Sequence, residues 1–226
     1  MAVVCFDFDD VILDGNLAYT LLKEVSDKKR DVKALIGYAE SKHKNFITFF
    51  KKAVGVLEGK EYKILKEIVK SIPPKTGYKI IKKLNKNGYN IVIASMNDRK
   101  IIKFFLKRHN MLKYVDDIFA PDLETKNGKL TGEISGFNLG DEKCNVPQLI
   151  KGKYGNVSNR DIYYIGDGND DLALLTKVNG IVFNPSKWAR MRIFENKRAK
   201  KRINSKRLFL IEEDDLWKVG DIIKKD

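Results

Sequence analysis

The stretch Val3-Val4-Cys5-Phe6-Asp7-Phe8-Asp9-Asp10-Val11 decides how the rest of the chain is interpreted. Its four apolar residues run directly into three carboxylates within four positions. A short apolar run rich in Val and Phe predicts a strand that is buried on both faces. Active sites of open parallel sheets form beyond the carboxyl ends of the strands, so we expect these carboxylates to lie at such a site.

Asp7 and Asp9 are two positions apart, so on a continuing strand both side chains would point to the same face. Two carboxylates held that close repel each other unless a cation lies between them. Mg²⁺ suits this pair, because it prefers oxygen ligands and usually also keeps waters and a substrate phosphate. A structural alternative stays open here, since Asp10 and Asp14-Gly15 are also common in a capped turn between a strand and a helix.

The composition restricts the class of protein. With 226 residues, 43% of them hydrophobic, the chain can form one large domain or a core with a smaller insertion. No segment approaches the roughly 20 apolar residues of a membrane helix, and the N-terminus does not resemble a signal peptide. Cys5 and Cys144 have no metal-type spacing, so we expect two free thiols and a cytoplasmic location.

The net charge of +14 is compatible with a nucleic-acid partner, but it also fits the Lys-rich surface of a thermostable protein. Residues 187–207 differ from the rest, because ten Lys or Arg occur there together with Trp188, Met191, Ile193 and Phe194. Two alternatives follow for this segment. It is either an amphipathic helix packed on the sheet with a solvated basic side, or a patch for a phosphate-rich substrate, RNA or an acidic partner.

The pattern after the first strand predicts an inserted helical region. Apolar residues recur at helical spacing from about residue 16 to 71, and Pro73-Pro74 ends the block because proline cannot continue a helix. We therefore predict an all-helical cap over residues 16–72, and a core formed by residues 1–15 and 73–226.

Beyond residue 73, helices and strands alternate. Strands are predicted at 89–95, 118–120, 161–165, 181–183 and 208–211, with a hairpin around Asn127-Gly128. Helices are predicted at 77–86, 142–153 and 172–177. A further helix is predicted to begin after Asp98, which would cap it, and two more are predicted in the basic segment and at the end of the chain. Such alternation predicts an α/β fold with a Rossmann-like parallel sheet covered by helices on both faces.

Three predicted strands end in residues with catalytic potential: Asp7 and Asp9, then Ser95, then the loop Gly166-Asp167-Gly168-Asn169-Asp170-Asp171. A single Ser or Gly-Asp loop after a strand is usually only a turn. Together they supply what phosphoryl transfer needs, namely a carboxylate nucleophile, an acid–base group, metal ligands and a hydroxyl for the phosphate oxygens. Lys143, 23 positions before Gly166, offers the positive charge that phosphate sites also use.

On these residues the chain resembles the haloacid dehalogenase superfamily, within it the phosphoserine-phosphatase-like branch. Asp7-Phe8-Asp9 is similar to the first signature, Ile91-Val92-Ile93-Ala94-Ser95 to the second, Lys143 to the third and the loop from Gly166 to the fourth. The residues 118–120 and 127–132 also resemble that branch. The resemblance covers about residues 3–183.

The resemblance implies a Mg²⁺-dependent phosphatase that acts on a small phosphorylated metabolite. Asp7 would be the nucleophile that forms an aspartyl-phosphate, and Asp9 would be the general acid and base. Mg²⁺ would be held by the Asp7 carboxylate, the Asp9 carbonyl and Asp167, with Asp171 supporting these ligands. The phosphate would be bound by Ser95, Met96 and Lys143.

The chain departs from phosphoserine phosphatases where the substrate would bind. Their Glu after the first motif aligns with Asn16, and their cap Arg aligns with Ala53. Phe46, Phe49 and Lys52 complete the predicted substrate contacts of the cap. Because phosphoserine needs partners for an ammonium and a carboxylate, we expect another substrate.

Three alternatives stay open: a phosphoserine phosphatase proper, a phosphotransferase on the same fold, or a nucleic-acid-associated protein that uses Lys187–Arg207 on a degenerate version of the fold. The joint presence of Asp7, Asp9, Lys143, Asp167 and Asp171 favours an enzyme. Asp170 stands where the family usually has Asn, which adds negative charge beside the predicted metal site. The sequence does not indicate whether the protein is a monomer or an oligomer.

Overall fold

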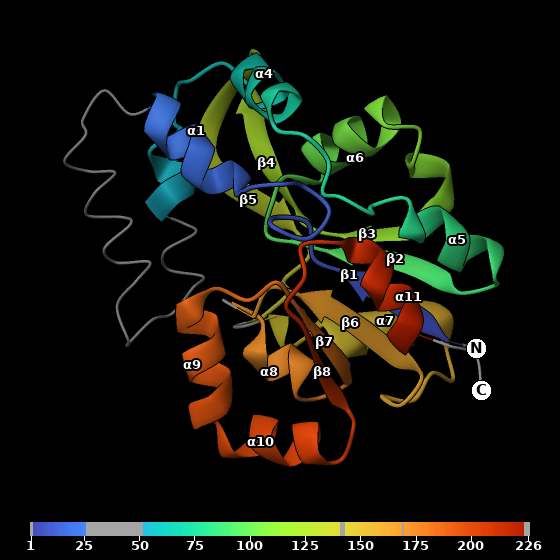
Figure 1. Ribbon diagram of the computed structural model, residues 1–226. Coiled ribbons are helices and arrows are strands. Elements are labelled where there is room, and N and C mark those ends of the chain that lie inside the picture. The colour runs from blue at the N-terminus through green and yellow to red at the C-terminus, as the bar shows by residue number, and fades with distance from the viewer. Residues whose placement is uncertain (1, 26–51, 141–142, 169, 224–226) are drawn as a thin grey trace.

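The computed structural model describes residues 2–25, 52–140, 143–168 and 170–223 (Figure 1). Its centre is a six-stranded parallel sheet with the strand order β3-β2-β1-β6-β7-β8. The strands are β1 (Val3–Phe6), β2 (Asn90–Ala94), β3 (Asp117–Phe119), β6 (Ile162–Gly166), β7 (Asn179–Phe183) and β8 (Leu208–Ile211). Because β1 pairs with both β2 and β6, its carboxyl end lies between the carboxyl ends of these two neighbours. The predicted α/β fold is confirmed.

Successive residues of β1 face two different hydrophobic layers. Val4 and Phe6 belong to a core shared with α5 (Ile80–Lys86), α6 (Arg99–Arg108) and α11 (Val219–Ile222). Val3 and Cys5 belong to a second core shared with α7 (Val146–Tyr154), α8 (Leu172–Leu175), α9 (Lys187–Glu195) and α10 (Lys197–Asn204). All four side chains are fully buried, so the strand is covered on both faces as its composition predicts.

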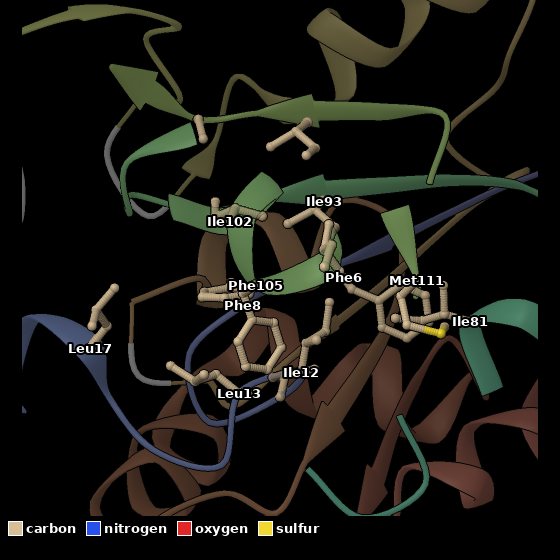
Figure 2. Packing of buried hydrophobic residues seen from close by; sticks show 14 of the residues in the cluster. Phe6, Phe8, Ile12, Leu13, Leu17, Ile81, Ile93, Ile102, Phe105 and Met111 are labelled. Atoms are coloured by element: carbon tan, nitrogen blue, oxygen red, sulfur yellow. The ribbon is translucent and has the colours of Figure 1, made fainter. Parts of the chain in front are cut away.

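Phe8 anchors the backbone that carries the first two carboxylates. Its ring packs edge-on against Phe105 of α6, with ring centroids 5.3 Å apart and an angle of 89° between the planes. Figure 2 shows Ile12 and Leu13 beside it, and all of these side chains are buried. Because Phe8 stands between Asp7 and Asp9, its packing fixes the backbone from which both carboxylates project.

The described part of the insertion lies with a hairpin on one side of the sheet (Figure 1). It contains α1 (Leu17–Val25), α4 (Lys63–Ser71) and a helical stretch at residues 52–55. The hairpin consists of β4 (Pro121–Lys126) and β5 (Lys129–Gly136), with the predicted Asn127-Gly128 turn at positive φ values of 52° and 76°. Backbone hydrogen bonds from Gly59 to Leu130 (2.8 Å) and from Tyr62 to Gly128 (2.9 Å) join the insertion to it. The domain limits at residues 16–72 stay a prediction.

A buried lysine ties together the two connections between the insertion and the core. The backbone N–H of Asp14 donates to Pro73 O, and the backbone N–H of Lys75 donates to Ile12 O, each at 2.9 Å. The Lys75 side chain forms ion pairs with Asp14 (2.7 Å) and with Asp214 of the loop after β8 (2.9 Å). Lys75 is only 5% exposed, so these carboxylates compensate the loss of water around its ammonium.

Several helices begin or end at other residues than predicted. Helix α7 begins at Val146 rather than at 142, because Lys143 has a left-handed backbone (φ 54°) and Pro147 suits only the first turn of a helix. Helix α5 begins at Ile80 rather than at 77, and Gly77 has a φ of 78°. The C-terminal helix is a short 3₁₀ turn, Leu216–Lys218, followed by α11.

The basic segment forms two helices instead of one. Asn196 leaves the helical conformation (φ −77°, ψ 115°), and its side chain caps α10 by accepting from the N–H of Ala199 at 3.0 Å. Ala189, Ile193 and Ala199 are buried against the core, and Lys197, Lys200 and Lys201 are exposed. Met191 and Phe194 are exposed, so the apolar residues of this segment pack only in part as the first alternative expects, and binding of nucleic acid or an acidic partner stays a prediction. None of the helices in the described ranges combines the length and apolar character that a bilayer crossing needs.

Candidate active site

The carboxyl ends of β2, β1 and β6 bring the predicted catalytic residues together. Asp7 follows β1, Ser95 follows β2 and Asp167 follows β6, and all three side chains are buried. The backbone N–H of Asp7 donates to Ile165 O at 2.8 Å, and that of Ser95 donates to Phe119 O at 3.1 Å. The hydrogen bonding of the sheet therefore extends to Asp7 and Ser95 and holds their backbone in place.

Lys143 reaches this edge from the loop before α7, although the sequence predicts it inside a helix at 142–153. Its Nζ lies 2.5 Å from Asp7 Oδ2, 3.7 Å from Asp170 Oδ1 and 3.9 Å from Asp171 Oδ2. It also donates to the hydroxyl of Tyr164 at 3.1 Å. Burial acts to lower the pKa of Lys143, but the three carboxylates outweigh it and raise this pKa. Lys143 is therefore charged and can attract a phosphate oxygen.

Asp7 and Asp9 have raised pKa values. Burial raises the pKa of Asp7 to about 6, although Lys143 and the backbone N–H of Phe8, at 2.7 Å from Oδ1, act in the opposite direction. Burial raises the pKa of Asp9 to about 7, against hydrogen bonds from the Asn97 side chain and from the N–H of Leu17, 3.2 Å from Oδ1. A carboxyl group that titrates near neutral pH can both give and take a proton, which is what general acid–base catalysis requires of Asp9.

Four carboxylates converge on one point of the site. Asp7, Asp167, Asp170 and Asp171 each place an oxygen within 4.8 Å of the others. The fully buried Asp171 accepts from Tyr164 OH at 2.9 Å through Oδ2, whereas its Oδ1 has no hydrogen-bond partner in the described part of the chain. A buried carboxylate oxygen without a donor is costly, and a cation would satisfy it. This set of hard oxygen donors therefore fits the predicted Mg²⁺.

Tyr164, which the sequence did not point to, and Gly166 of the predicted loop shape this cluster. Tyr164 of β6 holds both Lys143 and Asp171 through its hydroxyl. A Cβ atom on Gly166 would collide with the Asp171 carboxylate and would lie 2.8 Å from the Tyr164 ring, so glycine is required where the loop folds back. Tyr164 and Gly166 are two positions apart, so the two-residue period of a strand places them on the same face. This spacing is the only feature of the sequence that indicates their proximity.

Asp170 and Asn97 also have larger roles than the sequence indicates. Asp170 belongs to the carboxylate cluster, although we predict it only as extra negative charge. Asn97 donates to Ser95 Oγ through its backbone N–H (3.2 Å) and through its side chain (3.3 Å). Because Asn97 also bonds Asp9, it orients the predicted phosphate-binding hydroxyl and the predicted acid together.

The remaining predicted residues have no printed contact with the carboxylate cluster or lie outside the described ranges. Met96 is partly buried and packs against both hydrophobic cores, so only its backbone is left to contact phosphate. Asn16 is exposed and caps α1, accepting from the N–H of Tyr19 at 2.9 Å. Lys52 is exposed. Phe46 and Phe49 lie outside the described residues.

Comparisons with known proteins identify the family of the chain. The sequence profile described as "haloacid dehalogenase-like hydrolase" matches residues 4–176. A phosphoserine phosphatase of Archaeoglobus fulgidus is 27% identical over 192 residues, which are 80% of this chain but only 52% of that relative, so the chain spans about half its length. A phosphoserine phosphatase of Methanocaldococcus jannaschii is 27% identical over 178 residues, covering 77% of this chain and 81% of the relative.

Solved structures show the same fold. One titled as a phospho-aspartyl intermediate analogue of phosphoserine phosphatase has a TM-score of 0.76 and 24% identity, and the match covers 99% of both chains. A substrate-bound phosphoserine phosphatase complex has a TM-score of 0.77 and 22% identity, with 99% of this chain and 98% of the other covered. The predicted superfamily and its phosphoserine-phosphatase-like branch are confirmed. The chain belongs to the haloacid dehalogenase-like hydrolase family.

Proposed function

We propose that this hydrolase is a Mg²⁺-dependent phosphatase that cleaves a small phosphomonoester through an aspartyl-phosphate on Asp7. The observation that carries the proposal is the setting of the Asp7 carboxylate, which lies 2.5 Å from Lys143 and within a cluster of four carboxylates. The phosphoserine phosphatases among the relatives support this reaction class. A reducing cytoplasm is part of the proposal, and it agrees with free thiols at Cys5 and Cys144.

The first step transfers the phosphoryl group to the protein. An oxygen of Asp7 bonds to phosphorus while the bond from phosphorus to the leaving oxygen breaks. Asp9 gives its proton to that oxygen, so the leaving group departs as a neutral alcohol. Lys143 and the Ser95 hydroxyl hold the phosphate oxygens while negative charge moves between them.

The second step releases phosphate. The Asp9 carboxylate takes a proton from water, the water oxygen bonds to phosphorus, and the bond between phosphorus and Asp7 breaks. Inorganic phosphate leaves, Asp7 is again a free carboxylate, and Asp9 is again protonated. Asp9 can serve both steps because its pKa of about 7 makes either form accessible near neutral pH.

Asp7, Asp167 and Asp170 would hold the Mg²⁺ ion, with the Asp9 carbonyl and the unsatisfied Asp171 oxygen as further candidates. When bound, the ion supplies positive charge between a phosphate dianion and a carboxylate nucleophile that would otherwise repel each other. Lys143 alone balances only one of the clustered carboxylates.

Release of p-nitrophenolate from p-nitrophenyl phosphate, measured at saturating MgCl₂, tests the proposal. Asp7→Asn should abolish turnover, because an amide cannot displace the leaving group. Asp9→Asn should lower kcat by about 10²- to 10⁴-fold through the loss of acid–base catalysis. Asp221→Asn, which makes the same change at an exposed carboxylate of α11, is the control and should keep full activity. An Asp7→Asn protein with wild-type turnover would rule out this mechanism.

A further inference from the structure

Helices α9 and α10 carry a large share of the positive charge of the chain. Residues 187–207 contain ten Lys or Arg and a single acidic residue, Glu195, so they account for nine of the fourteen net positive charges. No other stretch of 21 residues has so large an excess. The two helices contact each other and lie at the outer edge of the molecule (Figure 1). Their exposed side chains therefore form one strongly basic area, which we call the basic surface.

Helix α10 supplies charges that no carboxylate in the described ranges compensates. Its buried Ala199 and half-buried Ile203 pack on the core, so the opposite side of the helix faces water. The basic side chains exposed there are Lys197, Arg198, Lys200 and Lys201. None of these four forms an ion pair with a described residue. Like charges on one helix repel each other, and a polyanion would relieve this repulsion.

Helix α9 exposes apolar side chains beside these charges. Met191 and Phe194 are 46% and 47% exposed, on the other side of α9 from the fully buried Ile193. The helix is therefore attached to the core without them. The guanidinium of Arg192 lies over the half-buried ring of Trp188, 4.7 Å from its centroid. Aromatic rings next to basic side chains are the arrangement on which unpaired bases stack.

We propose that the basic surface binds single-stranded nucleic acid. The Lys and Arg side chains of α10 contact the phosphates, and unpaired bases stack on Phe194 and Trp188 of α9. A duplex offers the same phosphates, but its bases are stacked on each other and cannot use the rings. This inference concerns a surface outside the catalytic cluster and does not depend on the proposed phosphatase activity.

Two other anionic partners fit the basic surface less well. Protein interfaces are depleted in Lys, whereas three of the four exposed basic side chains of α10 are Lys. A helix that lies on an anionic membrane buries its apolar face in lipid. In α9 and α10 that face is already packed on the core, and only Met191 and Phe194 remain for the bilayer.

Fluorescence anisotropy of a labelled single-stranded RNA of about 15 nucleotides, titrated with the full chain, tests the inference. If α10 neutralises four phosphates, Kd should rise about 50-fold between 50 and 200 mM KCl. The same RNA annealed to its complement should bind about tenfold more weakly. Absence of binding at 50 mM KCl, or equal or tighter binding of the duplex, would overturn the inference.

Competition with other anions separates the possible partners. Polyglutamate and phosphatidylserine vesicles are added to the labelled complex at the same concentration of negative charge as unlabelled RNA. Only the unlabelled RNA should displace the label efficiently, because neither competitor offers bases to the rings. Equal displacement by polyglutamate would assign the surface to an acidic protein, and equal displacement by vesicles would assign it to a membrane; either result overturns the proposal.

Two triple variants locate the bound strand. Both replace three exposed lysines of one helix by glutamine, so they change the net charge equally. The α10 variant combines Lys197→Gln, Lys200→Gln and Lys201→Gln, and the α6 control combines Lys100→Gln, Lys103→Gln and Lys107→Gln. The α10 variant should weaken binding of the single strand by about tenfold or more, and the control by less than about twofold. Equal losses in both would show that RNA responds to net charge alone and would overturn the assignment.

A second pair of variants tests the stacking. Phe194→Ala should weaken binding of the single strand by about fivefold or more and leave the salt dependence unchanged, because it removes a ring but no charge. Trp217→Ala removes a ring that is exposed to a similar extent, 43%, in the C-terminal 3₁₀ turn and should leave Kd unchanged. An unchanged Kd for Phe194→Ala, or equal losses in both variants, would overturn the role of the rings and with it the preference for single strands.

Discussion

Asp98 joins three parts of the structure next to the site, and Asp98→Ala should destabilise the fold strongly. Its carboxylate is 4% exposed and caps α6 through the N–H of Ile101. It also accepts from the N–H of Leu123 in β4 and from the hydroxyl of Tyr62 in the insertion. Alanine would remove all three hydrogen bonds while leaving the three donors in place.

The expected loss follows from these contacts. Removal of an N-cap costs about 1 kcal/mol. A buried N–H left without a partner, as for Leu123, costs about 1–3 kcal/mol more. Tyr62 is half-buried, so water can reach its hydroxyl, and we add nothing for it. The free energy of unfolding should therefore fall by about 2–4 kcal/mol.

Urea unfolding followed by circular dichroism measures this loss for Asp98→Ala. Tyr62→Phe removes one of the three bonds, and because water reaches this hydroxyl it should lose less than about 1 kcal/mol. Asp98→Asn should fall between the two, because one amide oxygen remains but the NH₂ group cannot accept a hydrogen bond. If Asp98→Ala loses no more stability than Tyr62→Phe, Asp98 does not hold these segments together.

Three further predictions concern the site. Chelation with EDTA should abolish phosphate release, and MgCl₂ should restore it. Asp167→Ala should raise the Mg²⁺ concentration needed for activity or abolish turnover. Full activity of the chelated protein would contradict the metal site. Gly166→Ala should lower both Tm and activity, because the added Cβ overlaps the Asp171 carboxylate, and unchanged values of both contradict this. In a phosphometabolite panel, O-phosphoserine should not have the highest kcat/KM, because Asn16 offers its ammonium only an amide and Ala53 offers its carboxylate nothing; a tenfold preference for it shows that their alignment is wrong.

The sheet was predictable because the apolar composition of β1 alone indicates a buried strand. Val3 to Phe6 alternate between two cores, and a strand covered on both faces has to be apolar throughout. The ends of α7 and of the basic helices were harder to predict. They depend on single residues. The left-handed Lys143 has a side chain held by Asp7 and Tyr164, which are distant in sequence, and the extended Asn196 caps α10 with its side chain.

The site was predictable to the extent that it lies at strand ends. Asp7, Ser95 and Asp167 directly follow buried strands, so topology alone brings them together. Tyr164 was missed because a tyrosine inside an apolar strand is usually only a core residue. Lys75 was missed because one lysine among 44 basic residues has no local signal until its two partners, distant in sequence, are placed beside it.

The central claim is that the phosphoryl group passes through Asp7, and rapid mixing of the Asp9→Asn variant with p-nitrophenyl phosphate and MgCl₂ tests it most directly. A nitrophenolate departs without protonation, so Asp7 can still attack phosphorus, whereas the attacking water lacks its base. The account predicts a burst of p-nitrophenolate equal to the enzyme concentration. After an acid quench, mass spectrometry should find one phosphoryl group on the peptide that contains Asp7. Steady turnover by this variant with no burst and no phosphorylated Asp7 peptide would contradict the account.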